Sequence, residues 1–149
     1  MLKSTEEKLW HVVCKIATKS PKSLKQILKK LMQKGITKKK SHQLVARLLE
    51  ANIYSESACI DNIILHYKER AKGRFWIEKE LNRREFPPIL ISQRINAVYK
   101  PIDEEQTLRG LWLRYKVTEH KNAKARFVAT AWQRGFPKNL IFELVHEED

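Results

Sequence analysis

The chain has 149 residues, of which 42% are hydrophobic and 32% are charged, and this composition predicts a soluble globular protein. No apolar run approaches the roughly 20 residues of a membrane-spanning helix, and the start of the chain, with Glu6 and Glu7, does not have the pattern of a signal peptide, so we expect a cytoplasmic location. The formal net charge of +13 indicates a polyanionic partner, either nucleic acid or an acidic protein surface.

Three short helices are predicted in the first 50 residues. A capping box at residues 4–7 opens the first helix. The dipeptide Ser20-Pro21 predicts the start of the second helix, with serine as the cap and proline in the first turn. Gly35 ends that helix, because glycine adopts the left-handed conformation of a helix exit at low cost. The third helix opens at Thr37 or Ser41.

The same order of elements recurs twice along the chain. In the second set, Ser55 marks the start of the first helix, Gly73 the start of the middle helix, and Pro87-Pro88 the start of the third. The third set opens at Asp103, and its middle helix contains Phe127. With few glycines and prolines elsewhere, the whole chain is predicted to be helical.

The exits of the three middle helices share one pattern, in which a base and a turn position are followed by an apolar residue. The three copies are Lys34-Gly35-Ile36, Arg84-Glu85-Phe86 and Arg134-Gly135-Phe136. A unit of about 45–50 residues buries its apolar faces poorly when it is alone. We therefore predict an all-α fold of three tandem three-helix repeats, stacked into an elongated, curved array, with the repeats at residues 1–53, 54–101 and 102–149.

Positive charge is concentrated in the N-terminal third. Residues 1–50 contain 13 Lys/Arg and 3 Asp/Glu, residues 51–100 contain 9 and 6, and residues 101–149 contain 8 and 8. Any single lysine is expected simply to be solvated, but eight of them without an intervening acid exceed what solubility requires. These eight candidate binding residues are Lys22, Lys25, Lys29, Lys30, Lys34, Lys38, Lys39 and Lys40.

Lys22, Lys25 and Lys29 have the spacing of one exposed helical stripe. A second candidate group lies in the middle repeat, where arginine can bind phosphate or carboxylate through two parallel hydrogen bonds. Its members are Arg70, Lys72, Arg74, Arg83 and Arg84. Glutamates are interspersed with these bases, among them Glu80, so intrahelical salt bridges are an equal alternative. The tryptophans Trp10, Trp76, Trp112 and Trp132 are expected to pack against neighbouring repeats.

No pattern in the sequence indicates catalysis, a cofactor or a metal site. The four glycines are isolated, so no phosphate-binding loop is predicted. The five histidines do not have the spacing of metal ligands. Cys14 and Cys59 fall in apolar helical patterns and are expected to be buried free thiols. The sequence therefore predicts a non-enzymatic protein that needs neither cofactor nor metal.

The residues around the middle helices resemble the RecX family of bacterial RecA modulators. That family has a glycine before an Ile-x-x-Glu-Leu helix that ends in a base, a glycine and an aliphatic residue. The matching positions are Gly73, Ile77, Glu80, Leu81, Arg84 and Phe86 in the second repeat, Ala131, Arg134, Gly135, Phe136 and Ile141 in the third, and Leu28, Leu31, Lys34, Gly35 and Ile36 in the first. The resemblance covers nearly the whole chain.

This resemblance implies a regulator that binds RecA, lies in the groove of the RecA–DNA filament, and inhibits recombinase and co-protease activity. Such a protein would modulate homologous recombination, DNA repair and the SOS response. RecA and its DNA filaments are the implied partners, together with weak, non-specific binding of single- or double-stranded DNA. We expect a monomer.

Two positions depart from the family pattern. Family members carry a tyrosine, an aliphatic residue and two acids at the junction of the first two repeats, where this chain has Ile53-Tyr54-Ser55-Glu56. The glycine after the second middle helix is replaced by Glu85. Because glutamate is poorly suited to a left-handed exit, we expect a different local turn there.

Two other functions remain open from the sequence. Paired short helices with a glycine exit can imitate a helix-turn-helix, so a sequence-specific DNA-binding regulator is the alternative. It would bind one operator tightly, whereas the RecA modulator would bind DNA weakly, with steep salt dependence and no sequence preference. A helical-repeat adaptor unrelated to DNA is the third hypothesis, and it leaves the lysine cluster unexplained.

Overall fold

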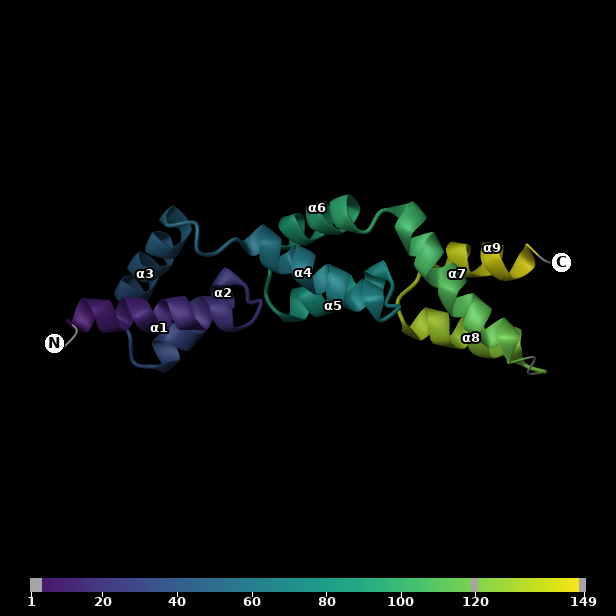
Figure 1. Ribbon diagram of the computed structural model, residues 1–149, viewed down its shortest axis with the longest axis horizontal. Coiled ribbons are helices and arrows are strands. Elements are labelled where there is room, and N and C mark those ends of the chain that lie inside the picture. Colours follow the sequence, from purple (N-terminus) through teal and green to yellow (C-terminus); the bar gives the residue numbers. More distant parts are fainter. Residues whose placement is uncertain (1–3, 119–120, 148–149) are drawn as a thin grey trace.

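The structure, a computed structural model, describes residues 4–118 and 121–147, and all regular secondary structure in those residues is helical. Figure 1 shows groups of consecutive helices following one another along a single long axis, with the two termini at opposite ends. The helices are α1 (Thr5–Lys19), α2 (Leu24–Gln33), α3 (Lys38–Glu50), α4 (Glu56–Glu69), α5 (Arg74–Arg83), α6 (Pro88–Val98), α7 (Pro101–Val117), α8 (Ala123–Gln133) and α9 (Lys138–His146). The predicted all-α, elongated fold is confirmed for this part of the chain.

Three hydrophobic cores lie along the axis, one for each consecutive set of three helices. Their fully buried members include Val13, Ile27 and Leu48 in the first core, Ile64, Ile77 and Leu81 in the second, and Leu108, Phe127 and Phe136 in the third. Each middle helix contributes to its own core. Each set of three helices therefore has a core of its own.

The first four helices begin at side-chain caps. The hydroxyls of Ser4, Thr37 and Ser55 each accept a hydrogen bond from the backbone N–H three residues later. The predicted start of α2 at Ser20 is wrong, because Ser23 is the cap. Its hydroxyl accepts from the Gln26 amide over 3.1 Å, and the Gln26 side chain accepts from the Ser23 amide over 3.3 Å, which completes a capping box.

The three middle helices end in the same way. The turn position has a φ of 88° at Gly35, 65° at Glu85 and 82° at Gly135, and in each case the next residue donates its amide back to a carbonyl of the last turn. The expectation of a different local turn at Glu85 is therefore wrong. A glutamate in this conformation costs about 1–2 kcal/mol relative to glycine.

Within the described residues, no helix is long and apolar enough to cross a membrane. The same residues contain no group of three or more histidine, cysteine or acidic side chains placed to hold a metal ion.

Candidate functional site: two joints and a basic cleft

The start of each of the first two middle helices packs against the exit of the next middle helix. We call these contacts the first joint (residues 22–26 against 84–86) and the second joint (residues 72–76 against 134–136). At the second joint the contact is made by backbone. The Gly73 amide donates to the Arg134 carbonyl over 2.7 Å, and the Phe75 amide donates to the Gly135 carbonyl over 3.0 Å.

Two glycines make this close approach possible. A Cβ on Gly73 would lie 2.5 Å from the Gly135 carbonyl, and a Cβ on Gly135 would lie 2.2 Å from the Trp76 amide nitrogen. Real Cβ atoms essentially never come that close to backbone. The second joint therefore has no room for a side chain at either position. The Trp76 ring was expected to pack against a neighbouring repeat, but it packs against the core of its own unit and lies beside Tyr67.

A buried ion pair also holds the second joint. The Glu104 carboxylate, whose residue is 2% exposed, accepts from the Arg74 amide over 2.7 Å and from the Arg74 Nε over 2.9 Å. Arg74 also donates to the Tyr99 carbonyl. Burial raises the pKa of Glu104, and the hydrogen bonds from Arg74 oppose that effect. Arg74 was a predicted binding residue, but its guanidinium is engaged inside the molecule.

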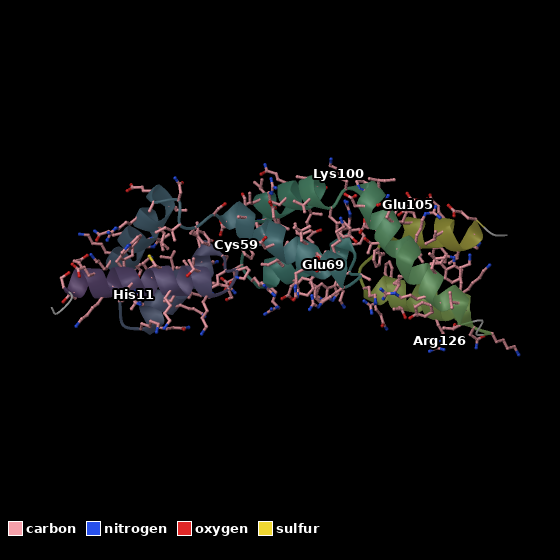
Figure 2. The ribbon with its side chains drawn as sticks, in the orientation of Figure 1. His11, Cys59, Glu69, Lys100, Glu105 and Arg126 are labelled. Atoms are coloured by element: carbon pink, nitrogen blue, oxygen red, sulfur yellow. The ribbon has the colours of Figure 1, made fainter. Side chains whose placement is uncertain are left out.

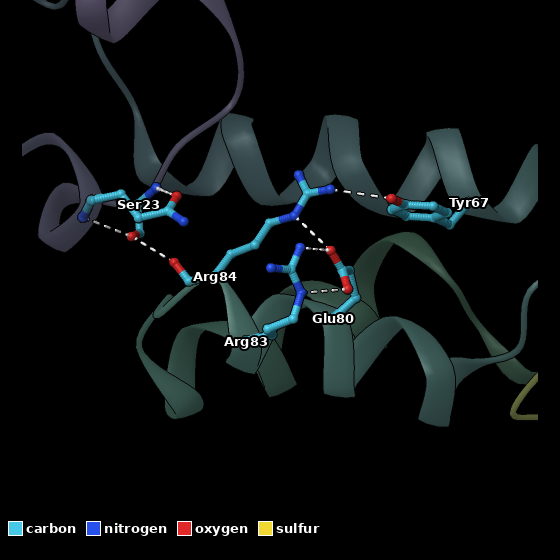
Figure 3. Close-up of polar contacts among 6 residues, drawn as sticks. Ser23, Tyr67, Glu80, Arg83 and Arg84 are labelled. Atoms are coloured by element: carbon cyan, nitrogen blue, oxygen red, sulfur yellow. Dashed lines mark hydrogen bonds and ion pairs between the residues drawn. The ribbon is translucent and has the colours of Figure 1, made fainter. Parts of the chain in front are cut away.

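Side chains mediate the first joint instead. Ser23 and Glu85 stand where the second joint has Gly73 and Gly135. The Ser23 hydroxyl donates to the Arg84 carbonyl over 2.8 Å (Figure 3), and the Leu24 amide donates to the Glu56 carboxylate over 2.8 Å. In the described part of the chain, no backbone hydrogen bond connects residues 22–26 with residues 84–86. The first joint is therefore held less closely than the second.

A cleft of about 390 Å³ opens at the first joint. We call it the basic cleft, and its lining residues are Ser20, Pro21, Lys22, Gln26, Lys29, Lys30, Gln33, Arg83, Arg84 and Glu85. It brings Lys29 and Lys30 of α2 together with the two arginines at the end of α5. These belong to the two candidate groups that the sequence kept separate, so the structure joins part of each into one site.

Glu85 is the acidic residue among those that line the basic cleft. Its carboxylate accepts a hydrogen bond from Lys29 and lies 3.6 Å from the Lys25 Nζ. The hydrogen bond from Lys29 is the main cause of a lowered Glu85 pKa. The side chains of Lys25 and Lys29 stay 68% and 51% exposed. Lys30 is also exposed and has no carboxylate partner among the described residues.

The arginines of the cleft share one acid on their own helix. Arg83 and Arg84 both bind the Glu80 carboxylate, each with its Nε at 3.0 Å from an oxygen, and Arg84 also donates to the Tyr67 hydroxyl (Figure 3). These hydrogen bonds, chiefly the one from Arg83, lower the pKa of Glu80 to about 2. The predicted alternative of intrahelical salt bridges is therefore present. Arg83 nevertheless remains 68% exposed, so it still faces solvent.

Lys22 is not part of an exposed stripe, and that prediction is wrong. It precedes α2, is 5% exposed, and its ammonium donates to the Ile16 carbonyl over 3.1 Å and to the Ser20 hydroxyl over 2.7 Å. Burial lowers its pKa. Lys22 lines the cleft and adds positive charge to it. Its hydrogen bonds, however, are made inside the molecule, where they hold the turn between α1 and α2 in place.

The other predicted basic residues lie outside the cleft. Lys34, Lys38 and Lys39 are exposed near the α2–α3 turn, and Lys40 pairs with Glu6 over 2.7 Å. Arg70 is exposed beside His66, and the Lys72 ammonium lies 4.5 Å from the centre of the Trp76 ring. The two cysteines are free and partly buried. Figure 2 shows Cys59 between the first two units, where it contacts both cores.

The third unit has an exposed aromatic surface, which includes Trp132 and Phe142 and which was not predicted from the sequence. Trp132 was expected to pack against a neighbouring repeat, but it is 59% exposed. It lines an apolar pocket of about 350 Å³ with Val128, Lys138, Ile141 and Phe142. Trp132 directly follows the buried Ala131, which places it about 100° around the helix from that residue, and this offset from the buried stripe is the sequence signal for its exposure.

The sequence matches no model of a known protein family and no curated protein. The structure is similar to the crystal structure of RecX from Lactobacillus salivarius, with a TM-score of 0.78 and 13% sequence identity over 95% of this chain and 94% of that one. It is also similar to a crystal structure of the regulatory protein RecX, with a TM-score of 0.75 and 12% identity over 95% of this chain and 71% of that one. The chain therefore has the fold of RecX.

Proposed function

We propose that this protein is a non-enzymatic regulator of RecA. It binds RecA and lies in the groove of the RecA–DNA filament, where it inhibits the recombinase and co-protease activities and so modulates recombination, repair and the SOS response. The observation that carries the proposal is the similarity of fold to RecX structures over 95% of the chain. The protein acts in the cytoplasm as a monomer.

Shape and charge support this function. The three cores follow one another along one axis (Figure 1), so the molecule is long and thin, as a ligand of a helical groove must be. Its excess of positive charge lies in the first third, which can face DNA phosphates or an acidic protein surface within that groove. A long array that is basic at one end fits a site where protein and phosphate lie side by side.

The proposed contact residues are bases of the first two units that are exposed or partly exposed to solvent. Lys22 and Arg74 are left out because their side chains are engaged inside the molecule. The proposed contacts are Lys25, Lys29, Lys30, Lys34, Lys38, Lys39, Lys40, Arg70, Lys72, Arg83 and Arg84.

The test adds the purified protein to RecA assembled on single-stranded DNA and follows ATP hydrolysis. We expect the rate to fall when the protein is stoichiometric with RecA, and repressor cleavage by the same filaments to fall in parallel. A polylysine of similar net charge serves as the control for non-specific competition for DNA. Unchanged hydrolysis at stoichiometric amounts, or a fall no larger than that caused by polylysine, would contradict the proposal.

A further inference from the structure

The basic cleft already contains an anion that belongs to the chain itself. The Glu85 carboxylate accepts a hydrogen bond from Lys29 and lies within ion-pair distance of Lys25, and both lysines reach it from α2 across the first joint. Of the residues that line the cleft, five are basic and one is acidic. Glu85 thus neutralises only a small part of the positive charge that surrounds it.

Glu85 occupies a position where the other two units have glycine. Its φ of 65° is left-handed, like those of Gly35 and Gly135, so the chain keeps a glutamate there against a local conformational preference. At the second joint a side chain in this position would collide with the backbone of Trp76. At the first joint the side chain has room, because Ser23 separates α2 from the α5 exit.

The lining of the cleft has the chemistry of a phosphate contact. Apart from Pro21, every lining residue is Lys, Arg, Ser, Gln or Glu. Lysine, arginine, serine and glutamine are the side chains that bind phosphate and sugar oxygens in protein–nucleic acid complexes. Protein partners are usually held by aromatic or apolar anchors in pockets, and the cleft offers no pocket of that kind. The lining therefore favours nucleic acid over an acidic peptide.

We propose that the basic cleft binds a phosphate group of a nucleic-acid backbone, and that Glu85 is an internal competitor which leaves Lys25 and Lys29 when the phosphate enters. A contact to phosphate carries no sequence information, so binding at this cleft is independent of sequence. The inference deepens the proposed function, on which it rests for the presence of DNA near the protein.

The competitor is tested by removing its charge. Binding of a short fluorescein-labelled oligothymidine to the full chain is measured by fluorescence anisotropy, without RecA, for wild type and Glu85→Gln. We expect the variant to bind about threefold more tightly, which is the effect of removing one exposed ion pair that competes with the ligand. The matched control is Glu147→Gln, because Glu147 pairs with Arg109 in the third unit and its replacement changes the net charge equally.

The cleft is tested by removing one of its cations. Lys30→Ala should weaken binding more than Lys39→Ala, since both lysines are exposed but only Lys30 lines the cleft. Lys30→Ala should also reduce the slope of log K against log salt by about 0.7, the value for one phosphate contact on a single strand. Equal effects of Glu85→Gln and Glu147→Gln, or of Lys30→Ala and Lys39→Ala, would overturn the proposal.

A polyglutamate peptide separates the two classes of partner. If Glu85→Gln and Lys30→Ala change the affinity for polyglutamate and leave the affinity for oligothymidine unchanged, the cleft binds an acidic protein and the phosphate assignment is wrong. RecA ATP hydrolysis is measured separately on the same variants. Inhibition of RecA together with no role of the cleft in DNA binding would refute this inference alone, whereas absence of inhibition would refute the proposed function alone.

Discussion

The Gly73 amide donates a hydrogen bond to the Arg134 carbonyl over 2.7 Å, so the second and third units meet backbone to backbone. At the equivalent place in the first joint, the Ser23 hydroxyl reaches the Arg84 carbonyl over 2.8 Å. Two glycines thus let the backbones touch at the second joint, whereas side chains keep the backbones apart at the first joint. The basic cleft lies at the first joint, where α2 and the end of α5 stay far enough apart to leave a volume between them.

Gly135→Ala should destabilise the protein much more than Gly35→Ala. Both glycines have a left-handed φ, so each substitution costs about 1 kcal/mol in backbone strain. At Gly35 nothing lies within 4 Å of an added Cβ, whereas at Gly135 the Trp76 backbone nitrogen is 2.2 Å away. We expect a total loss of about 3 kcal/mol for Gly135→Ala, measured by urea unfolding followed by circular dichroism.

The control for this pair is Gly110→Ala. Gly110 lies inside α7 and has nothing within 4 Å of an added Cβ, so alanine should raise the free energy of unfolding by about 0.5–1 kcal/mol through helix propensity. Equal losses for Gly135→Ala and Gly35→Ala would show that the second joint does not depend on the close backbone contact.

Glu104→Ala should cost more stability than Glu56→Ala. Glu104 is 2% exposed and binds both the amide and the guanidinium of Arg74, so its removal leaves a partly buried cation unpaired and costs about 3 kcal/mol. Glu56 is less buried and accepts a backbone hydrogen bond from Leu24, which is worth about 1 kcal/mol. Urea unfolding of the two variants measures the difference, and a larger loss for Glu56→Ala would contradict the ranking of the joints.

Local features of the fold could be predicted because they depend on neighbours in sequence. The Thr37 cap, the helix start at Gly73 and the left-handed exit at Gly35 each follow from one or two residue types. The cap of α2 was misplaced for the same reason, because both Ser20 and Ser23 suit a helix start. The capping box that Ser23 forms with Gln26, three residues later, distinguishes the two serines. The further hydrogen bond from Ser23 to the Arg84 carbonyl lies in the next unit and is not contained in a local pattern.

The site itself was predicted only in part. Charge counting found the lysines of α2 and the arginines of α5, but it could not place them in one cleft, because their meeting depends on how two units pack. It also could not show that Lys22 turns inward to cap the end of α1. Glu85 was expected to change the turn. Its partners, Lys25 and Lys29, lie in another unit, and they help to retain a conformation that its residue type disfavours.

Glu80 should make stability depend on pH in the acid range. Its pKa is lowered from a usual 4.5 to about 2 by Arg83 and Arg84. A lowered folded-state pKa means that the stabilisation is complete above about pH 4.5 and is lost as the pH falls towards 2. Because Arg83 is largely exposed, we expect Glu80→Gln to cost only about 1 kcal/mol at neutral pH.

The measurement for Glu80 is urea unfolding of wild type and Glu80→Gln over a range of pH. The difference between the two free energies of unfolding should be constant near neutrality and should shrink towards zero as the pH approaches 2. A difference that does not change with pH would mean that the Glu80 carboxylate contributes nothing through its charge.

Glu85→Gly should be more stable than Glu85→Gln by about 1 kcal/mol. Both substitutions remove the ion pairs with Lys25 and Lys29, but only glycine also removes the cost of a side chain at a φ of 65°. The midpoints of urea unfolding, at equal slopes, give this comparison directly. Equal stability, or a more stable glutamine variant, would show that the left-handed turn is not strained.

We propose that the protein restrains RecA on DNA through the basic cleft at its first joint. The most direct measurement is RecA ATP hydrolysis on single-stranded DNA with stoichiometric wild type, with Lys29→Glu/Lys30→Glu in the cleft, and with Arg114→Glu/Arg126→Glu on exposed positions of the third unit. We expect wild type and the third-unit variant to slow hydrolysis, and the cleft variant to do so at least about tenfold more weakly. Hydrolysis that is unaffected by wild type, or slowed equally by all three proteins, would contradict it.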